Sequence, residues 1–201
     1  MARARKTETA QVAGLLAATG ADLVSAPVEA FQLRFGGLEG DRHAGLTRRS
    51  CSRTRWHVRG TEIANTRQIS IVSAEECAEI AQLLDVPRIE PRLIGANIVI
   101  GGLSALSGLP PSTRLQFPSG ATLFVTEENM PCRVAGGMLA QALGLPRLEL
   151  DFPRLAVGRR GLVALVEREG EVRVGDTIEL VLPRRRSAPP AVSAAGANTE
   201  A

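Results

Sequence analysis

The chain has 201 residues, which is enough for one domain with a substantial buried core. Hydrophobic residues make up 44% of it and charged residues 22%, a balance that is typical of globular proteins. No run of about 18 apolar residues occurs, so we expect no membrane-spanning segment. Three widely spaced cysteines argue against a disulfide framework and favour a cytoplasmic location.

The basic residues are almost all arginines, and this restricts the chemistry that the chain can perform. The formal net charge is +3, and Lys6 is the only lysine among 24 lysines and arginines. Schiff-base catalysis needs a lysine amine, and Lys6 lies in a segment that we expect to be flexible. Arginine instead offers planar forks for phosphate or carboxylate. The absence of tyrosine excludes phenolic acid–base catalysis.

The first part of the chain contains two predicted strands. Residues 11–18 form a short apolar run that ends before Gly20, and apolar side chains alternate with polar ones over residues 31–35. The basic start of the chain lacks the apolar core of a secretory signal. We therefore expect residues 1–10 to form a flexible leader.

A polar loop bounded by glycines follows at residues 37–45 and contains Asp41 and His43. Glycines permit tight turns and close approach to a ligand, and both polar residues are common in functional sites. A turn-capping aspartate and an ordinary hydrogen-bonded histidine are equally good interpretations, because turns use these residues freely.

Residues 42–61 contain six arginines and no acidic residue. The segment shows no regular period, which predicts a long loop. Such a loop would attract an anionic ligand through its field and its guanidinium forks, or would simply be a solvated surface.

The rest of the chain contains more short strands and two helices. The predicted strands cover residues 67–72, 98–100, 114–117, 121–126, 162–166, 172–174 and 178–182. Ser73–Glu76 has the pattern of a capping box, which predicts the start of a helix. Cys77 falls on the apolar face of that helix, so we assign it to the core. A second helix is predicted after Cys132.

About nine short strands with two helices that do not alternate with them predict a mostly β fold, a barrel with inserted helices, rather than a doubly wound sheet. We place a single domain at residues 11–182 and a disordered tail at residues 183–201. The sequence contains no dinucleotide-binding glycine motif, no P-loop and no paired CxxC motif, so nucleotide and zinc-ribbon sites lack support.

Residues 129–133, Asn-Met-Pro-Cys-Arg, join a predicted strand to the second helix. Asn129 is a residue type that caps helices. Cys132 would then lie where backbone N–H groups are unpaired and the helix dipole is positive, with Arg133 beside it. This setting favours a thiolate that attacks electrophiles or binds soft metals. The alternative interpretation is that Cys132 is a small buried hydrophobic residue.

Several separated motifs occur together in one order. They are Gly37–Gly45, Arg67–Ser73, Arg92-x-x-Gly95-x-Asn97, Pro131–Arg133, Arg160-Gly161-x-Val163 and Gly170–Leu180. Their order and spacing resemble those of the MOSC domain, which is named after the C-terminal domain of molybdenum cofactor sulfurase. The resemblance covers about residues 11–182.

The resemblance implies a β-barrel of the pyruvate-kinase barrel type with a cleft for a molybdenum–pterin cofactor or its sulfur. It implies that Cys132 is the catalytic residue and either holds molybdenum as a thiolate ligand or carries a persulfide. It also implies that Arg67, Arg92 and Asn97 line the cleft and hold the phosphate and the pterin. With the residues chosen on local grounds, the candidate cofactor-binding residues are Asp41, His43, Arg67, Arg92, Asn97 and Arg133.

Two features depart from the family pattern. Many relatives carry a His-Gly-Gly loop before the cleft, whereas here the basic Arg42–Arg59 loop stands in roughly that place. Some relatives are fused to a pyridoxal-phosphate desulfurase domain. This chain has no room for such a domain and no usable lysine, so we do not expect pyridoxal phosphate in it.

Four hypotheses about function follow. The leading one is a molybdenum–pterin protein that reduces N-hydroxylated small molecules with electrons from a partner protein, or that handles sulfur for the cofactor. The alternative is a Cys132 persulfide carrier that is loaded by a sulfur-donor protein. Binding of nucleic acid or another polyanion is less favoured, because 3% aromatic residues are too few for a stacking platform. Zinc held by His43, Cys51 and His57 is least favoured, because their spacing matches no known site.

Overall fold

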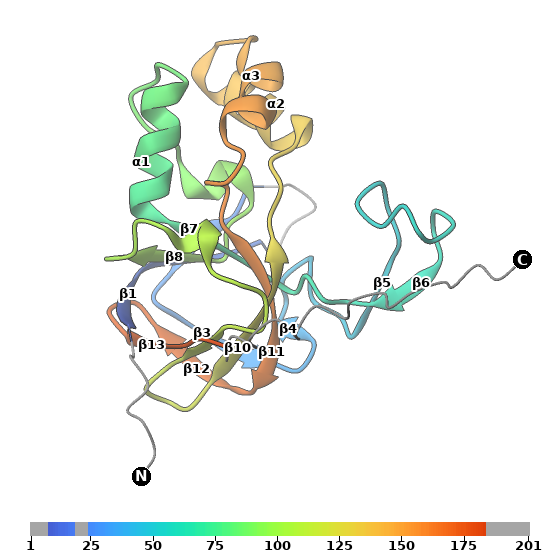
Figure 1. The fold of residues 1–201 in the computed structure, drawn as a ribbon, viewed down its shortest axis with the longest axis vertical. Helices are drawn as coiled ribbons and strands as arrows, with labels where there is room; N and C mark the ends of the chain where they lie inside the picture. The colour runs from blue at the N-terminus through green and yellow to red at the C-terminus, as the bar shows by residue number, and fades with distance from the viewer. Residues whose placement is uncertain (1–7, 19–23, 184–201) are drawn as a thin grey trace, which may run out of the picture.

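A closed ring of seven strands forms the body of the protein in this computed structural model, which describes residues 8–18 and 24–183 (Figure 1). The ring strands are β1 (Glu8–Ala17), β7 (Ile69–Ser73), β8 (Ile98–Gly101), β9 (Arg114–Gln116), β10 (Thr122–Glu128), β11 (Leu162–Arg168) and β13 (Thr177–Val181). Their order around the ring is β13, β9, β10, β11, β7, β8 and β1, and β1 pairs with β13 to close it.

Neighbouring ring strands are antiparallel except for β7 and β8, which are parallel. The mostly β barrel that the sequence predicts is thus confirmed, and its mixed strand pairing is compatible with the pyruvate-kinase barrel type. Apolar side chains that alternate along the strands fill the interior, among them Ile69, Ile71, Ile98, Leu115 and Leu123.

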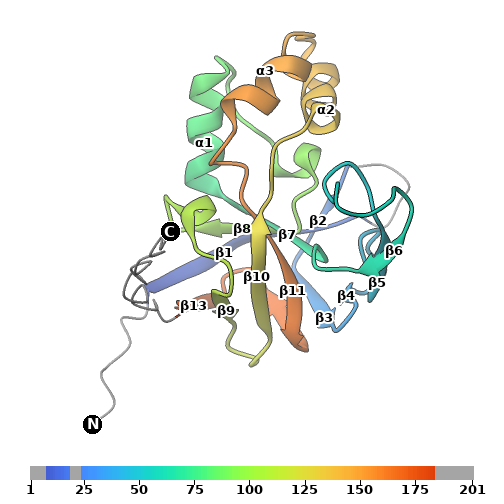
Figure 2. The same cartoon turned by 45° about the vertical axis from the view of Figure 1, so that its right-hand side comes forward.

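Six shorter strands lie outside the ring. They are β2 (Ala26–Val28), β3 (Ala30–Arg34), β4 (Gly37–Leu38), β5 (Thr47–Arg49), β6 (Glu62–Ala64) and β12 (Gly170–Arg173). β2 pairs with β1, and β12, β3 and β4 form a small separate sheet. β5 and β6 pair only with each other and project from the body, as Figures 1 and 2 show. We call residues 47–64 the arm.

Three α-helices and two 3₁₀ turns gather at one end of the barrel (Figure 2). They are α1 (Ala74–Leu83), η1 (Pro91–Ile94), η2 (Leu106–Gly108), α2 (Arg133–Leu143) and α3 (Leu148–Leu155). The apolar faces of α1, η1, α2 and α3 form a second core that includes Cys77, Ile80, Leu139 and Phe152, which confirms the assignment of Cys77, whereas Leu106 of η2 belongs to the barrel core. No helix in the described part of the chain is long and apolar enough to cross a membrane.

The predicted start of α1 is confirmed. Ser73 is its N-cap residue, and the Ser73 hydroxyl accepts a hydrogen bond from the backbone N–H of Glu76. The second half of the predicted capping box is wrong, because the buried Glu76 carboxylate turns away from Ser73. It accepts hydrogen bonds of 2.8 Å from both the backbone N–H and the hydroxyl of Ser107, which fastens α1 to η2.

Several predicted boundaries need correction. β1 begins at Glu8, because residues 8–10 pair with β13, so the flexible leader cannot extend to residue 10. Phe35 lies beyond the end of β3 and is exposed rather than half-buried. The end of the first strand at Gly20, residues 1–7 of the leader and residues 184–201 of the tail lie outside the described residues.

A tight backbone contact at Gly161 positions the chain that enters β11. Gly161 has φ of +92°, and a Cβ atom at this position would lie 2.0 Å from the carbonyl oxygen of Ile71 on β7. Its own carbonyl accepts a hydrogen bond from the N–H of Asn129. Only glycine fits, because both the conformation and the space exclude a side chain.

We therefore expect Gly161→Ala to lower the free energy of unfolding by about 3 kcal/mol, from the combined cost of left-handed backbone and overpacking. The control is Gly144→Ala, where φ is +66° but no atom lies within 4 Å of the added Cβ. The control should cost only about 1 kcal/mol. Equal costs in urea denaturation of the two variants would contradict this account of Gly161.

Candidate functional site

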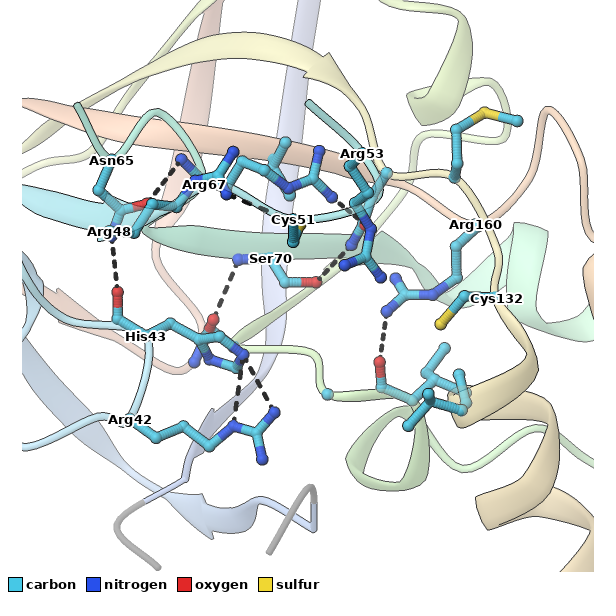
Figure 3. Close-up of a pocket in the computed structure, with 18 of the residues that line it drawn as sticks. Arg42, His43, Arg48, Cys51, Arg53, Asn65, Arg67, Ser70, Cys132 and Arg160 are labelled. Atoms are coloured by element: carbon cyan, nitrogen blue, oxygen red, sulfur yellow. Dashed lines mark hydrogen bonds between the residues drawn. The ribbon is translucent and has the colours of Figure 1, made fainter. Parts of the chain in front are cut away.

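A cavity of about 590 Å³ lies where the barrel, the start of α2 and the arm meet (Figure 3). Its wall is built by segments that are distant in sequence: the 42–53 region, β7, η1, the β10–α2 connection and the start of β11. The charged and sulfur-bearing residues that line it are Arg42, Arg48, Arg53, Arg67, Arg160, Cys51, Cys132 and Met130. Among the described residues the lining contains five arginines and no carboxylate, so these residues make the cavity electropositive.

Cys132 is the N-cap residue of α2, with φ of −142° and ψ of 161°. Its side chain makes no capping hydrogen bond and is partly exposed, and it lines the cavity. The sequence predicts Asn129 as the cap, and that prediction is wrong by three residues. The thiol therefore stands at the helix N-terminus itself, where backbone N–H groups favour an anionic neighbour.

Arg160 is the most constrained cation of the cavity. It is only 6% exposed, and one of its terminal nitrogens, Nη2, donates to the carbonyl oxygen of Ile94. Burial lowers the pKa of Arg160 to about 10, so the guanidinium is still charged at neutral pH. Figure 3 shows it beside the sulfur of Cys132.

The second terminal nitrogen of Arg160, Nη1, is buried and has no hydrogen-bond partner among residues 8–18 and 24–183. Three buried side-chain N or O atoms lack a partner in the described residues, and two of them, Arg160 Nη1 and Arg48 Nε, belong to the lining of this cavity. A buried charged donor without an acceptor is costly, and an anionic ligand in the cavity would supply the missing acceptor.

Arg67 lines the cavity, and two side chains near the end of β10 hold its guanidinium in place. Its Nη1 pairs with Glu127 at 2.7 Å, and its Nη2 donates to the side-chain oxygen of Asn129 at 2.8 Å. The side-chain nitrogen of Asn129 donates in turn to the Ser70 hydroxyl at 3.1 Å. Asn129 therefore connects β7 to the segment that carries Cys132, instead of capping a helix.

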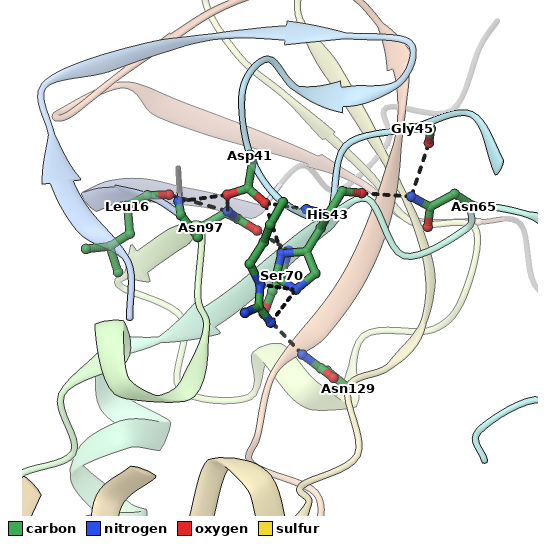
Figure 4. A network of polar contacts seen from close by, with 10 residues as sticks. Leu16, Asp41, His43, Gly45, Asn65, Ser70, Asn97 and Asn129 are labelled. Atoms are coloured by element: carbon green, nitrogen blue, oxygen red, sulfur yellow. Dashed lines mark hydrogen bonds and ion pairs between the residues drawn. The ribbon is translucent and has the colours of Figure 1, made fainter. Parts of the chain in front are cut away.

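A buried polar network lies behind the cavity wall (Figure 4). One oxygen of Asp41 accepts hydrogen bonds from the backbone N–H of His43 at 2.8 Å and from the ring Nδ1 of His43 at 2.9 Å. The other oxygen accepts from the N–H of Ala18 and from the side chain of Asn97. The side-chain oxygen of Asn97 accepts from Ser70 N–H, so one carboxylate ties three separate segments together.

The same network orients His43. Because Asp41 accepts from Nδ1, the opposite ring nitrogen, Nε2, receives the hydrogen bond from Arg42 Nε at 3.3 Å. Asp41 thus acts behind the cavity, whereas His43 and Asn97 line it. The predicted site residues His43, Arg67, Asn97 and Cys132 line this one cavity, whereas Asp41, predicted to bind the cofactor, lies behind its wall.

Arg92 and Arg133 are placed elsewhere, contrary to prediction. Arg133 is exposed and pairs with Glu149 on α3 at 2.6 Å, because the first residue of α2 faces the neighbouring helix. Arg92 lines a different cavity beside β1 and β2, because its successors Leu93 and Ile94 take the places on the cavity wall.

The arm supplies three residues of the cavity wall to which the sequence assigns no individual role in the cofactor site. The two ends of the arm, β5 and β6, pair as a β-hairpin, whereas the sequence predicts an uninterrupted loop for residues 42–61. Arg48, Cys51 and Arg53 lie on the cavity side of this hairpin and its loop. The number of arginines in the segment is the sequence signal for Arg48 and Arg53, and Cys51 enters the sequence analysis only as a candidate zinc ligand. Arg160 belongs to the Arg160-Gly161-x-Val163 motif, for which the sequence predicts no role.

Cys51 has a distinct environment on the arm. Its sulfur accepts a weak hydrogen bond from Arg48 Nη1 at 3.9 Å. The backbone N–H of Arg53 is the main cause of a lowered Cys51 pKa, and it outweighs the opposing effect of burial. The least favoured hypothesis, a zinc ion held by His43, Cys51 and His57, gains no support, because the described residues contain no group of three or more His, Cys, Asp or Glu side chains placed to hold an ion.

The family model for the MOSC domain matches residues 42–179, which include the arm, the cavity wall and most of the barrel. This chain belongs to the MOSC domain family. It is 43% identical over 176 residues to a Bacillus subtilis (strain 168) protein named "Putative metal-sulfur cluster biosynthesis proteins YuaD". That alignment covers 87% of this chain and 92% of the relative.

Solved structures of this MOSC protein's relatives have the same fold. The crystal structure of YuaD from Bacillus subtilis superposes with a TM-score of 0.88 at 42% identity, covering 90% of this chain and all of that one. YiiM from Escherichia coli gives a TM-score of 0.53 at 16% identity, covering 88% of this chain and 72% of that one. At that level of identity YiiM shows only that the fold is shared.

The Asp41 network predicts a specific pH dependence. Burial alone would raise the pKa of Asp41, but hydrogen bonds from His43 and Ala18 outweigh it and hold the pKa below its ordinary value. The ionised carboxylate therefore stabilises the fold at all pH values above the unfolded-state pKa. This contribution is lost as the pH falls through the lower folded-state pKa.

Asp41→Asn should lower the free energy of unfolding at pH 7 by about 1–3 kcal/mol. The reason is that the NH₂ group of asparagine would face N–H groups that donate to the carboxylate in the wild type, so these donors would lose their acceptor. The difference from the wild type should shrink below about pH 4, where the wild-type carboxylate also becomes protonated. Asp151→Asn, which removes a surface charge on α3, is the control. Urea titrations at several pH values measure this, and a pH-independent difference would contradict it.

Proposed function

We propose that this protein binds a molybdenum–pterin cofactor in the arginine-lined cavity, with the sulfur of Cys132 as the protein ligand of the metal. The observation that carries the proposal is the buried Arg160 guanidinium, which lies beside Cys132 with one donor unpaired. A phosphate-bearing cofactor supplies both an acceptor for that donor and a metal for the thiol.

The residues present fit such a group. Five arginines face the cavity, and planar guanidinium forks suit phosphate. A free metal ion would need several ligands from the protein, and the described residues offer no cluster of three. A metal that is already coordinated by an organic cofactor needs only one further ligand from the protein. A thiolate is a suitable ligand for a soft metal–sulfur centre.

Each residue then has a role that its position allows. Arg160 and Arg53 hold anionic oxygens, and Cys132 fixes the metal end of the cofactor. His43, which Asp41 orients, presents Nε2 at the wall, where it fixes the Arg42 guanidinium beside the cavity. When bound, the cofactor would supply redox chemistry for the reduction of N-hydroxylated small molecules with electrons from a partner protein.

A second candidate function is supported by two observations. Cys132 and Cys51 line the same cavity, which suits sulfur handling by thiols without a resident metal. A relative with 43% identity carries the name "Putative metal-sulfur cluster biosynthesis proteins YuaD". In this alternative Cys132 carries a persulfide, and the arginines stabilise its negative charge.

The molybdenum content of the purified protein tests the first proposal. From a host that makes the cofactor, the wild type should contain about one molybdenum per chain, and Cys132→Ser should lose it. Arg160→Met should reduce the content about tenfold or more, because a hydrogen bond to a charged group is lost.

Arg133→Met is the matched control, since Arg133 forms a surface ion pair away from the cavity. Its molybdenum content should equal that of the wild type. The proposal fails if wild-type protein from this host contains neither molybdenum nor pterin.

A further inference from the structure

Two thiols line one cavity from two separately built walls. Cys132 stands on the rigid side, between β10 and α2, and Cys51 stands on the arm. Both are partly exposed, whereas the third cysteine, Cys77, is buried in the helical core. The pair therefore differs from an isolated surface cysteine, because each thiol faces the space that the other one faces (Figure 3).

The surroundings of Cys51 suit a reactive sulfur. Arg48 Nη1 approaches it at 3.9 Å, and hydrogen bonding from Arg53 lowers the pKa of the thiol. A lowered pKa increases the fraction of thiolate, which is the form that attacks a sulfur donor. The thiolate is also a good leaving group when another thiolate attacks its persulfide.

The arm is built to move as a unit. Within the described chain, every hydrogen bond that residues 50–61 make has both partners inside the arm, including those of Ser50 to Val58 and of Cys51 to Thr54. The loop that carries Cys51 can therefore shift toward Cys132 without breaking a hydrogen bond to the barrel.

A further observation identifies the sulfur acceptor. The unpaired Nη1 of Arg160 is buried beside Cys132 and needs an anionic acceptor. A persulfide on Cys132 is such a group, because its terminal sulfur is negatively charged when ionised. The cavity thus offers a thiol that can receive sulfur, Cys51, and a charged position that can hold it, Cys132.

We propose that Cys51 takes sulfane sulfur from a persulfide donor and passes it to Cys132 across the cavity. This inference rests on the second proposed function, in which Cys132 carries sulfur. The donor is a persulfide of the form R–S–SH, on a small molecule or on a partner protein.

Both steps balance without an oxidant or a reductant. The Cys51 thiolate attacks the outer sulfur of R–S–SH, the donor S–S bond breaks, and RS⁻ leaves with the electron pair. The Cys132 thiolate then attacks the outer sulfur of the Cys51 persulfide, and the Cys51 thiolate leaves. The proton of the persulfide stays with the transferred sulfur or passes to solvent. One S–S bond forms and one breaks at each step.

The direction of transfer follows from the two positions. Cys51 lies on the arm, which projects from the body of the protein, so a donor can reach it there, and the Arg48 guanidinium beside its sulfur stabilises the thiolate that leaves. Cys132 lies against the buried charge of Arg160, which stabilises the product.

Time-resolved mass spectrometry tests the transfer. Reduced protein is mixed with cysteine persulfide, and samples are quenched with an alkylating agent and mapped for the added mass of one sulfur, about 32 Da. In the wild type the label should appear first on Cys51 and then on Cys132. In Cys132→Ser it should remain on Cys51, and in Cys51→Ser the loading of Cys132 should slow tenfold or more.

Cys77→Ala is the matched control, and its loading of Cys132 should equal that of the wild type. The proposal is overturned if Cys132 loads equally fast in the wild type and in Cys51→Ser. A second test uses the wild-type protein, so its result does not depend on whether the variants fold. Mild oxidation with diamide should form an intramolecular Cys51–Cys132 disulfide, and its absence at full oxidation would also overturn the proposal.

These outcomes distinguish a failure of the transfer from Cys51 to Cys132 from a failure of the two proposed functions. If Cys132 never accepts sulfur in any variant while Cys51 does, the sulfur-carrier function fails. If Cys132 accepts sulfur regardless of Cys51, only the transfer fails. Molybdenum content is measured separately on the wild type and on Cys132→Ser, so the cofactor proposal is judged independently.

Discussion

The site depends on one buried positive charge. Arg160 is almost fully enclosed, remains charged at neutral pH, and satisfies one side of its guanidinium with the Ile94 carbonyl while another donor stays unpaired. A buried charged donor without an acceptor destabilises the folded protein, and a bound anionic ligand would remove this destabilisation. The next residue, Gly161, fits against β7 only because it lacks a side chain. The barrel therefore fixes the backbone that carries Arg160 and, with it, the position of the charge beside Cys132.

The second constraint is the carboxylate of Asp41. It accepts four hydrogen bonds from three parts of the chain and so joins β1, the loop before the arm and the segment before β8. The consequence for the site is that His43 and Asn97 keep fixed orientations at the wall, while the arm beyond them is held mainly by its own hydrogen bonds. A rigid wall facing a movable one is an arrangement that suits ligand entry and transfer between thiols.

The sequence predicts the barrel because its strands are half-buried and alternate, and it predicts the start of α1 because Ser73 is a strong local signal. It fails at the arm, whose short strands are solvated on both faces and so show no apolar period. It also misses α3, where Pro153 lies inside the helix. Arg133 was chosen as the neighbour of Cys132 in sequence, but Arg160 is its neighbour in space. Only the long-range packing of β11 against β7 could reveal this.

The central claim is that the Cys132 sulfur binds the metal of a cofactor held by Arg160. X-ray absorption at the molybdenum edge tests this most directly on protein purified with its cofactor. The account predicts one more sulfur neighbour at molybdenum in the wild type than in Cys132→Ser loaded with the same cofactor under excess. The same number of sulfur neighbours in both proteins would contradict it.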